Sequence, residues 1–191
     1  MSSAPPVPPV PPVQPDTKDW TWVLTQPCPE CGFVAAELER SGFGEGLRAN
    51  AAAFARALRE PGATRRPAPT VWSTTEYACH VRDVHTIFDE RVRAMRDQDE
   101  PVFANWDQDE TAVEQRYDLQ DPAVVAVALV AAADQVAATY DTVPDRAWER
   151  RGFRSNGSEF TIDSIARYHL HDVVHHLWDV TTASQRQTGH A

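Results

Sequence analysis

The chain has 191 residues, which is enough for one domain with a sizeable hydrophobic core. Its 28 acidic and 18 basic side chains give a net charge of −10, which repels phosphate backbones and excludes sequence-independent nucleic-acid binding. The three cysteines are an odd number, so they do not form the disulfide framework of a small secreted protein. We expect no secretory leader, no segment long and apolar enough to be a membrane helix, and a location in the reducing cytoplasm.

Proline dominates the start of the chain, where residues 5–13 read PPVPPVPPV. Such a run lacks backbone donors and predicts an extended, Pro-rich tail over residues 1–18, either disordered or docked in an aromatic groove of a partner. Residues 19–43 follow as an irregular N-terminal arm that contains the Cys-x-x-Cys motif of Cys28 and Cys31.

From residue 44 onward the spacing of apolar residues predicts helices. The first is expected over 45–59 and ends before a Pro-Gly pair. The second begins at Ser73 and Glu76, whose Ser-x-x-Glu spacing is that of a capping box, and it continues to about residue 96. The polar stretch 97–120 predicts a long crossover loop with a short helix near 112–117.

The third helix is predicted to begin at Asp121 and Pro122, an N-cap followed by proline in the first turn, and to end near residue 142. Residues 148–160 predict a turn or short hairpin, and the fourth helix is expected from about 161 to 182. The pattern favours an all-α protein: an antiparallel four-helix bundle over 44–183, with a long crossover loop, the irregular N-terminal arm and a flexible C-terminal tail over 184–191.

Histidines carry the main functional signal, because four of the seven lie between positions 169 and 176 of the fourth helix. His171 and His175 are four residues apart and therefore share a helix face. His80 lies on the apolar stripe of the second helix, which points inward. Together they predict a three-histidine metal site with open coordination positions, suited to Zn²⁺, Ni²⁺, Co²⁺ or Fe²⁺.

Acidic and aromatic side chains near these histidines are candidates for the rest of a site. Glu76 and Asp83 flank His80 at helical spacing, so either could support a ligand or act as a general base. Tyr77 and Trp178 on the helices, and Trp106 in the crossover loop, are candidates to line a pocket.

Cys28 and Cys31 form half of a zinc knuckle, and no second Cys-x-x-Cys follows. Three interpretations stay open: a structural or inert pair, a second metal site with ligands that the sequence does not identify, and a redox pair. Cys79 lies about 100° round the second helix from His80 and is a poor partner for either site.

His80, together with His171-Asp172-Val173-Val174-His175-His176 in the fourth helix, resembles the DinB superfamily, including its YfiT-like and mycothiol-dependent maleylpyruvate isomerase-like branches. The resemblance covers most of 45–180. It implies a four-helix bundle with a long crossover that binds a divalent metal, commonly Zn²⁺ or Ni²⁺, through those three histidines. The known activities of such proteins are largely transfer or isomerisation reactions of small thiols such as mycothiol.

These observations predict a divalent-metal-dependent enzyme that acts on a small molecule, as a thiol S-transferase for small electrophiles with a mycothiol-type thiol as co-substrate. Lys18 is the only lysine, a bias typical of a GC-rich genome, and this favours mycothiol. Two alternatives stay open. One is a hydrolase that uses metal-bound water, with Glu76 or Asp83 as base. The other is a non-catalytic stress protein that binds a metal or ligand. A homodimer is the common assembly of such bundles.

Overall fold

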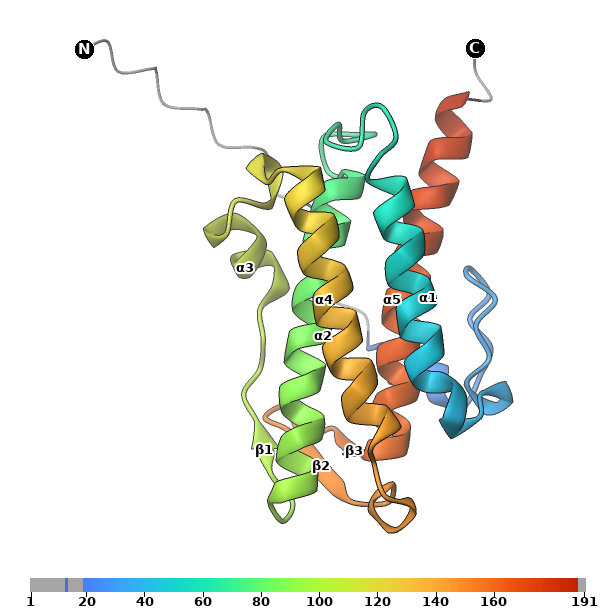
Figure 1. Cartoon of the computed structure of the whole chain (residues 1–191), viewed down its shortest axis with the longest axis vertical. Helices are drawn as coiled ribbons and strands as arrows, with labels where there is room; N and C mark the ends of the chain where they lie inside the picture. The colour runs from blue at the N-terminus through green and yellow to red at the C-terminus, as the bar shows by residue number, and fades with distance from the viewer. Residues whose placement is uncertain (1–12, 14–18, 189–191) are drawn as a thin grey trace, which may run out of the picture.

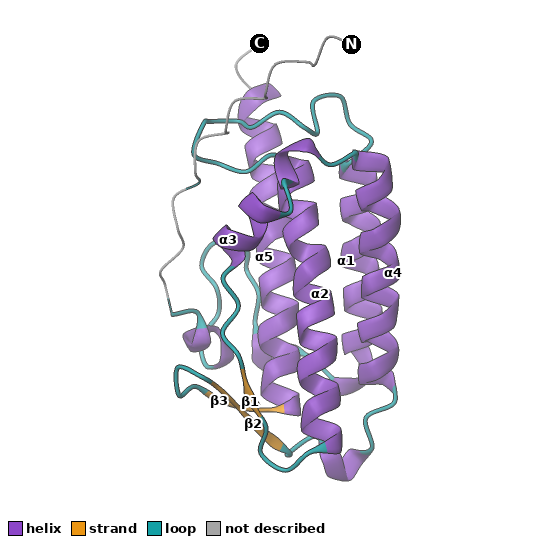
Figure 2. Cartoon of the chain, turned by 90° about the vertical axis from the view of Figure 1, so that its left-hand side faces the viewer, coloured by secondary structure: helices purple, strands orange, loops and turns teal. Residues whose placement is uncertain are grey.

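Four long helices stand side by side in the computed structural model, which describes residue 13 and residues 19–188 (Figures 1 and 2). Going round the bundle, each helix packs against the next in the order α1, α4, α2 and α5. The predicted four-helix bundle is confirmed. The helix bounds are α1 Phe43–Ala57, α2 Thr74–Asp97, α4 Pro122–Asp141 and α5 Ile162–Thr188.

The capping box predicted for the second helix is present. Ser73 Oγ accepts a hydrogen bond from the Glu76 amide at 3.2 Å, and the Glu76 carboxylate accepts one from the Ser73 amide at 2.8 Å. Asp121 caps α4 in a similar way, with its carboxylate accepting from the Ala123 amide at 2.7 Å. These local signals set where α2 and α4 begin.

The crossover between α2 and α4 climbs the length of the bundle, so these two neighbouring helices run in the same direction (Figure 1). The neighbouring helices α1 and α5 also run in one direction, so the expectation of an antiparallel bundle is wrong for both pairs. The crossover contains β1 (Val102–Phe103), the short helix α3 (Gln108–Glu114) and a 3-10 turn at Tyr117–Leu119. It is therefore more ordered than the loop that its polar sequence predicts.

A small sheet closes one end of the bundle (Figure 2). The predicted hairpin forms from β2 (Arg151–Arg154) and β3 (Glu159–Thr161), which pair antiparallel, and β1 adds in parallel with Val102 opposite Phe153. The sequence did not predict β1, because two residues carry no alternation. The all-α prediction holds for the bundle, and the sheet is an addition to it.

α4 is the most apolar helix, and by length and composition it could cross a membrane, which corrects the expectation that no such segment exists. It is the single helix of this kind within residues 19–188. In the structure it packs against α1 and α2, with Leu129 and Val136 fully buried. Core helices of bundles share this composition.

The N-terminal arm lies along α5 and consists of 3-10 turns at Thr21–Leu24, Ala35–Glu37 and Arg40–Gly42. Its Val23 is fully buried, and Arg167 of α5 donates to the backbone oxygens of Ala35 and Leu38.

The predicted Pro-rich tail falls outside the described residues apart from Val13. The predicted C-terminal tail over 184–191 is wrong up to residue 188, because α5 continues to Thr188.

Candidate metal centre

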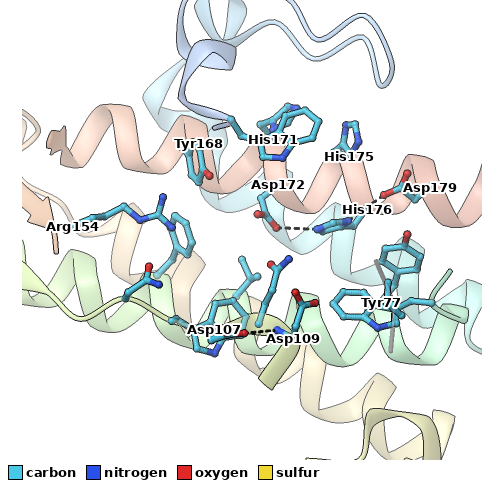
Figure 3. A pocket seen from close by; sticks show the side chains of 18 of the residues that line it. Tyr77, Asp107, Asp109, Arg154, Tyr168, His171, Asp172, His175, His176 and Asp179 are labelled. Atoms are coloured by element: carbon cyan, nitrogen blue, oxygen red, sulfur yellow. Dashed lines mark hydrogen bonds and ion pairs between the residues drawn. The ribbon is translucent and has the colours of Figure 1, made fainter. Parts of the chain in front are cut away.

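Two pairs of side chains of metal-ligand type alternate along α5, His171 with His175 and Asp172 with His176. Within each pair the residues are four apart and share a face, and the two faces are about 100° apart round the helix. Figure 3 shows His171 and His175 on the side of the helix where the N-terminal arm lies, and Asp172 and His176 on the side that faces α2. One helix therefore serves two separate clusters.

The first cluster joins α5 to α2 and consists of His80, Asp172 and His176, with one ligand atom of each within 4.8 Å of the others. Asp172 Oδ1 lies 3.8 Å from His80 Nε2 and 3.7 Å from His176 Nε2. Both separations are too long for hydrogen bonds. Two ligands of one metal ion are roughly 3.0–3.4 Å apart, so these atoms lie near the spacing of a coordination shell.

Buried atoms without partners make this cluster a candidate metal centre. Both ring nitrogens of His80 and Oδ1 of Asp172 are buried and make no hydrogen bond with any described residue. Leaving such groups unsatisfied is costly, and a divalent cation bound between them would remove the cost. The residues present thus fit a divalent metal.

Neighbouring side chains orient the two rings. His176 Nδ1 lies 3.2 Å from Asp179 Oδ2, which leaves Nε2 to face Asp172. The ring of His80 stacks on Trp106, with centroids 5.5 Å apart and an interplanar angle of 8°. A ligand histidine that gives its second nitrogen to a carboxylate is the usual arrangement in metal sites.

The electrostatics suit a cation. Burial lowers the pKa of His80, so its ring is neutral and can ligate through nitrogen. Burial alone would raise the pKa of Asp172, but His80 and His176 outweigh it and hold that pKa below its ordinary value. One carboxylate anion with imidazole nitrogens is a ligand set that Zn²⁺, Fe²⁺ and related ions accept.

A cavity of about 680 Å³ opens onto Asp172 and His176, and it is also lined by His171 and His175. Figure 3 shows Arg154 and Tyr168 toward one end of this cavity and Tyr77 with Asp179 toward the other. Its further lining includes Trp72, Arg91, Asn105, Trp106, Asp107, Gln108, Asp109 and Asn156. The volume is that of a small-molecule site, and three protein ligands leave coordination positions open toward it.

The second cluster joins α5 to the arm and consists of Cys28, Cys31, His171 and His175, again with one ligand atom of each within 4.8 Å. Burial, followed by the neighbouring histidines, lowers the pKa of His171 to about 4, and burial lowers that of His175. Burial raises the pKa of Cys31 to about 11, which is the opposite of a reactive thiolate.

The predicted three-histidine set is therefore divided between the two clusters: His80 lies with Asp172 and His176, and His171 and His175 lie with the cysteines. This corrects the grouping. The reason is the rotation of α5, which turns the Asp172 face toward α2 and the His171 face toward the arm. Both pairs have the same spacing, so spacing alone could not separate them.

Neither predicted carboxylate lies at the first cluster. Glu76 is buried in the capping box and forms an ion pair with Arg66. Asp83 pairs with Arg82 at 2.7 Å and accepts a hydrogen bond from the Tyr117 hydroxyl. Both carboxylates are thus held by other side chains, and neither is among the cavity's lining residues.

The predicted pocket aromatics divide as well. Tyr77 and Trp106 line the cavity, whereas Trp178 does not and instead packs against His175, with ring centroids 5.6 Å apart. Neither Asp172 nor His176 is among the ligands predicted from the sequence. Two signals in the sequence could have identified both clusters. Asp172 and His176 have the same four-residue spacing as His171 and His175, and the Cys-x-x-Cys motif lacks two ligands of a zinc site.

Comparison with known proteins agrees with the fold and places the chain in a family. The structure is similar to YfiT from Bacillus subtilis, described as a probable metal-dependent hydrolase with an unusual four-helix bundle topology, with a TM-score of 0.73 and 15% identity over 78% of this chain and 87% of that chain. No curated protein matches the chain significantly. The DinB superfamily model matches residues 45–180, which span most of the bundle and include His80, Asp172 and His176, and the chain belongs to the DinB superfamily.

Proposed function

We propose that this protein is a divalent-metal-dependent enzyme in which His80, Asp172 and His176 hold the ion at the wall of the cavity. The observation that carries this proposal is the convergence of three ligand atoms, with buried atoms of His80 and Asp172 left without hydrogen-bond partners among residues 19–188. When bound, the ion would supply Lewis-acid chemistry and lower the pKa of a coordinated thiol or water.

The substrate carries an anionic group. Arg91 and Arg154 both line the cavity, and within the described residues neither forms an ion pair with a carboxylate. Arg91 is only 6% exposed, and burial lowers its pKa to about 10, so it stays charged at neutral pH. Buried guanidinium groups are costly without a counter-charge, and a carboxylate or similar anion on the substrate would provide one.

The reaction that we propose is transfer of a small thiol to an electrophile. The cavity is large enough for two small molecules, and its wall of carboxylate and amide side chains suits a hydroxyl-rich thiol of the mycothiol type. The thiol sulfur forms a bond to the electrophilic carbon, the leaving group departs with the electrons of its bond, and the thiol proton passes to solvent. Trp72 and Trp106 would pack on the apolar part of the electrophile and exclude water.

Hydrolysis is the second candidate. It is supported by the likeness to YfiT, which is described as a probable hydrolase, and by the carboxylate of Asp109 in the cavity wall. In that reaction Asp109, rather than Glu76 or Asp83, would be placed to accept the proton of an attacking water.

One experiment separates these functions. The Zn²⁺- or Ni²⁺-loaded protein is incubated with a mycothiol-type thiol and either chloronitrobenzoate or the neutral chlorodinitrobenzene, and in parallel with a panel of carboxylate-bearing esters and amides. Thiol transfer predicts loss of free thiol and release of chloride, fastest with chloronitrobenzoate. Turnover of the esters or amides without thiol would favour the hydrolase, and no turnover in either panel would contradict an enzyme.

Three variants connect the activity to the site. Asp172→Asn should no longer bind the metal at the cavity, because the carboxylate ligand of that cluster is removed. Its rate of turnover should fall at least about 100-fold. Arg154→Met should raise KM for chloronitrobenzoate about tenfold or more while leaving the neutral substrate unchanged. Glu90→Gln, an exposed carboxylate on α2, is the matched control and should behave as wild type. A fully active Asp172→Asn protein would overturn the ligand assignment.

A further inference from the structure

The cysteine cluster is made by two segments that are far apart in sequence. Cys28 and Cys31 lie on the N-terminal arm, and His171 and His175 lie more than 130 residues later on α5. All four ligand atoms fall within 4.8 Å of one another, and Cys28 Sγ is 3.6 Å from His175 Nδ1. A tetrahedral zinc shell places sulfur and nitrogen ligands roughly 3.3–3.8 Å apart, so the cluster is close to that size.

The loop that carries the cysteines has the backbone of a tight knuckle. The Cys28 amide donates to the Phe33 oxygen at 2.8 Å, and the Gly32 amide donates to the Cys28 oxygen at 3.0 Å. Gly32 has a φ of +74°, a conformation that a side chain disfavours. This turn brings both sulfurs to the same side of the loop, toward α5.

The two histidines present the features of ligands. His175 turns Nδ1 toward Cys28, and its Nε2 lies 3.2 Å from a Glu30 carboxylate oxygen, the carboxylate support that metal-bound histidines usually have. His171 Nε2 is buried and has no hydrogen-bond partner among the residues that the structure describes. The ring of His171 is held between Trp20 and Phe33, with centroids 5.4 and 5.3 Å away.

We infer that Cys28, Cys31, His171 and His175 bind a structural zinc ion that fastens the N-terminal arm to α5. Four protein ligands close a tetrahedral shell and leave no position for substrate, which distinguishes this site from the three-ligand centre on the other face of the helix. The arm's secondary structure is limited to 3-10 turns, and its other anchors are side-chain contacts such as the buried Val23 and the ion pairs of Arg40 with Glu149 and Asp163. Trp20 and Glu30 of the arm also line the cavity, so the zinc would hold one of its walls in place.

The inference does not depend on the enzymatic activity, and cobalt can test it. Metal-free protein is titrated with Co²⁺, and thiolate ligation is read from the intense sulfur-to-cobalt charge-transfer absorption. Wild-type protein should bind two equivalents, one of them with this absorption. His80→Ala should lose one equivalent and keep the absorption, and Cys28→Ser should lose the absorption and keep the other equivalent.

Controls make each result decisive. Cys79→Ser changes the remaining cysteine, which lies in α2 outside both clusters, and it should keep both equivalents and the absorption. Cys31→His keeps four ligands, so it should still bind two equivalents with a weaker absorption. Two observations would show that Cys28→Ser folds: it retains one equivalent of cobalt, and its circular dichroism spectrum is as helical as that of the wild type.

Proteolysis gives a readout of the arm itself. Limited trypsin digestion should cleave at Arg40 in the chelated protein or in Cys28→Ser at least tenfold faster than in the zinc-bound wild type. Absence of a charge-transfer band in wild-type protein, or its loss in His80→Ala, would overturn the inference. So would wild-type protection of the arm in a Cys28→Ser and Cys31→Ser double variant.

Discussion

His85 on α2 and His169 on α5 place two more imidazoles in the interior, and these two rings bind each other instead of a metal. His85 Nδ1 lies 3.0 Å from His169 Nε2, and the Tyr140 hydroxyl lies 3.2 Å from His169 Nδ1. Both rings are fully buried. These contacts use both nitrogens of His169 and Nδ1 of His85, whereas His85 Nε2 is buried and has no hydrogen-bond partner among the described residues.

This pair predicts how stability depends on pH. Burial lowers the pKa of His85 to about 4, and burial together with His85 holds the pKa of His169 well below its ordinary value; Asp172 opposes both shifts. The unfolded chain, with an ordinary pKa near 6.5, takes up the proton first as pH falls. The stability from a neutral His85 is therefore complete above pH ~6.5 and is lost toward pH ~4, to the extent of about 3 kcal/mol.

His85→Gln keeps a hydrogen-bonding side chain at this position but removes the group of His85 that titrates. Urea unfolding with chelator at pH 7, 5.5 and 4.5 should show a shallower loss of stability in this variant than in wild type. Chelator in both samples removes any contribution from metal release. Equal slopes for the two proteins would contradict the assignment of acid sensitivity to this pair.

At the scale of elements, the start of α2 combines several interactions in a few residues. Ser73 and Glu76 cap each other's amides, and Arg66 pairs with the buried Glu76 carboxylate. Because His80 lies one turn after this cap, the cap also fixes the position of a metal ligand.

Ser73→Ala removes the side chain that satisfies the Glu76 amide. We expect a loss of about 1 kcal/mol in the free energy of unfolding, or a Tm lower by about 2–4 °C. Thr86→Ala, an exposed hydroxyl in the middle of the same helix, is the matched control and should cost nothing or stabilise slightly. Thermal unfolding of both variants checks this, and equal effects would contradict a special role for the cap.

The sheet depends on a residue without a side chain. A Cβ at Gly152 would lie 2.5 Å from Phe103 and 2.9 Å from Met95, so Gly152 is what lets β1 and α2 pack against the hairpin. We expect Gly152→Ala to destabilise the protein by about 1–3 kcal/mol. At Gly42 an added methyl meets no atom within 4 Å, so Gly42→Ala should change stability by less than about 1 kcal/mol in the same urea experiment. A neutral Gly152→Ala would mean that the sheet can move away from the bundle.

At the scale of the whole molecule, the sequence predicted what local rules determine. The helix starts at Ser73 and Asp121, the hairpin after residue 150 and the inward position of His80 all follow from caps, turns and periodicity. The division of the α5 side chains between two clusters does not follow from such rules. His171 with His175 has the same spacing as Asp172 with His176. Which pair faces α2 is decided by how α5 is rotated in the bundle, and this is a property of packing alone.

The family match begins at residue 45, but Trp20 and Glu30, which line the cavity, come before it. A protein trimmed to residues 45–180 would keep His80, Asp172 and His176 and would still form the bundle's main contacts. It would expose the ring of His171 and open the cavity to bulk water, which weakens every charge interaction inside. The residues that form the cavity therefore extend beyond the residues matched by the family model. If the trimmed protein were inactive, the cause would be the missing cavity wall, and the result would not count against an enzymatic function.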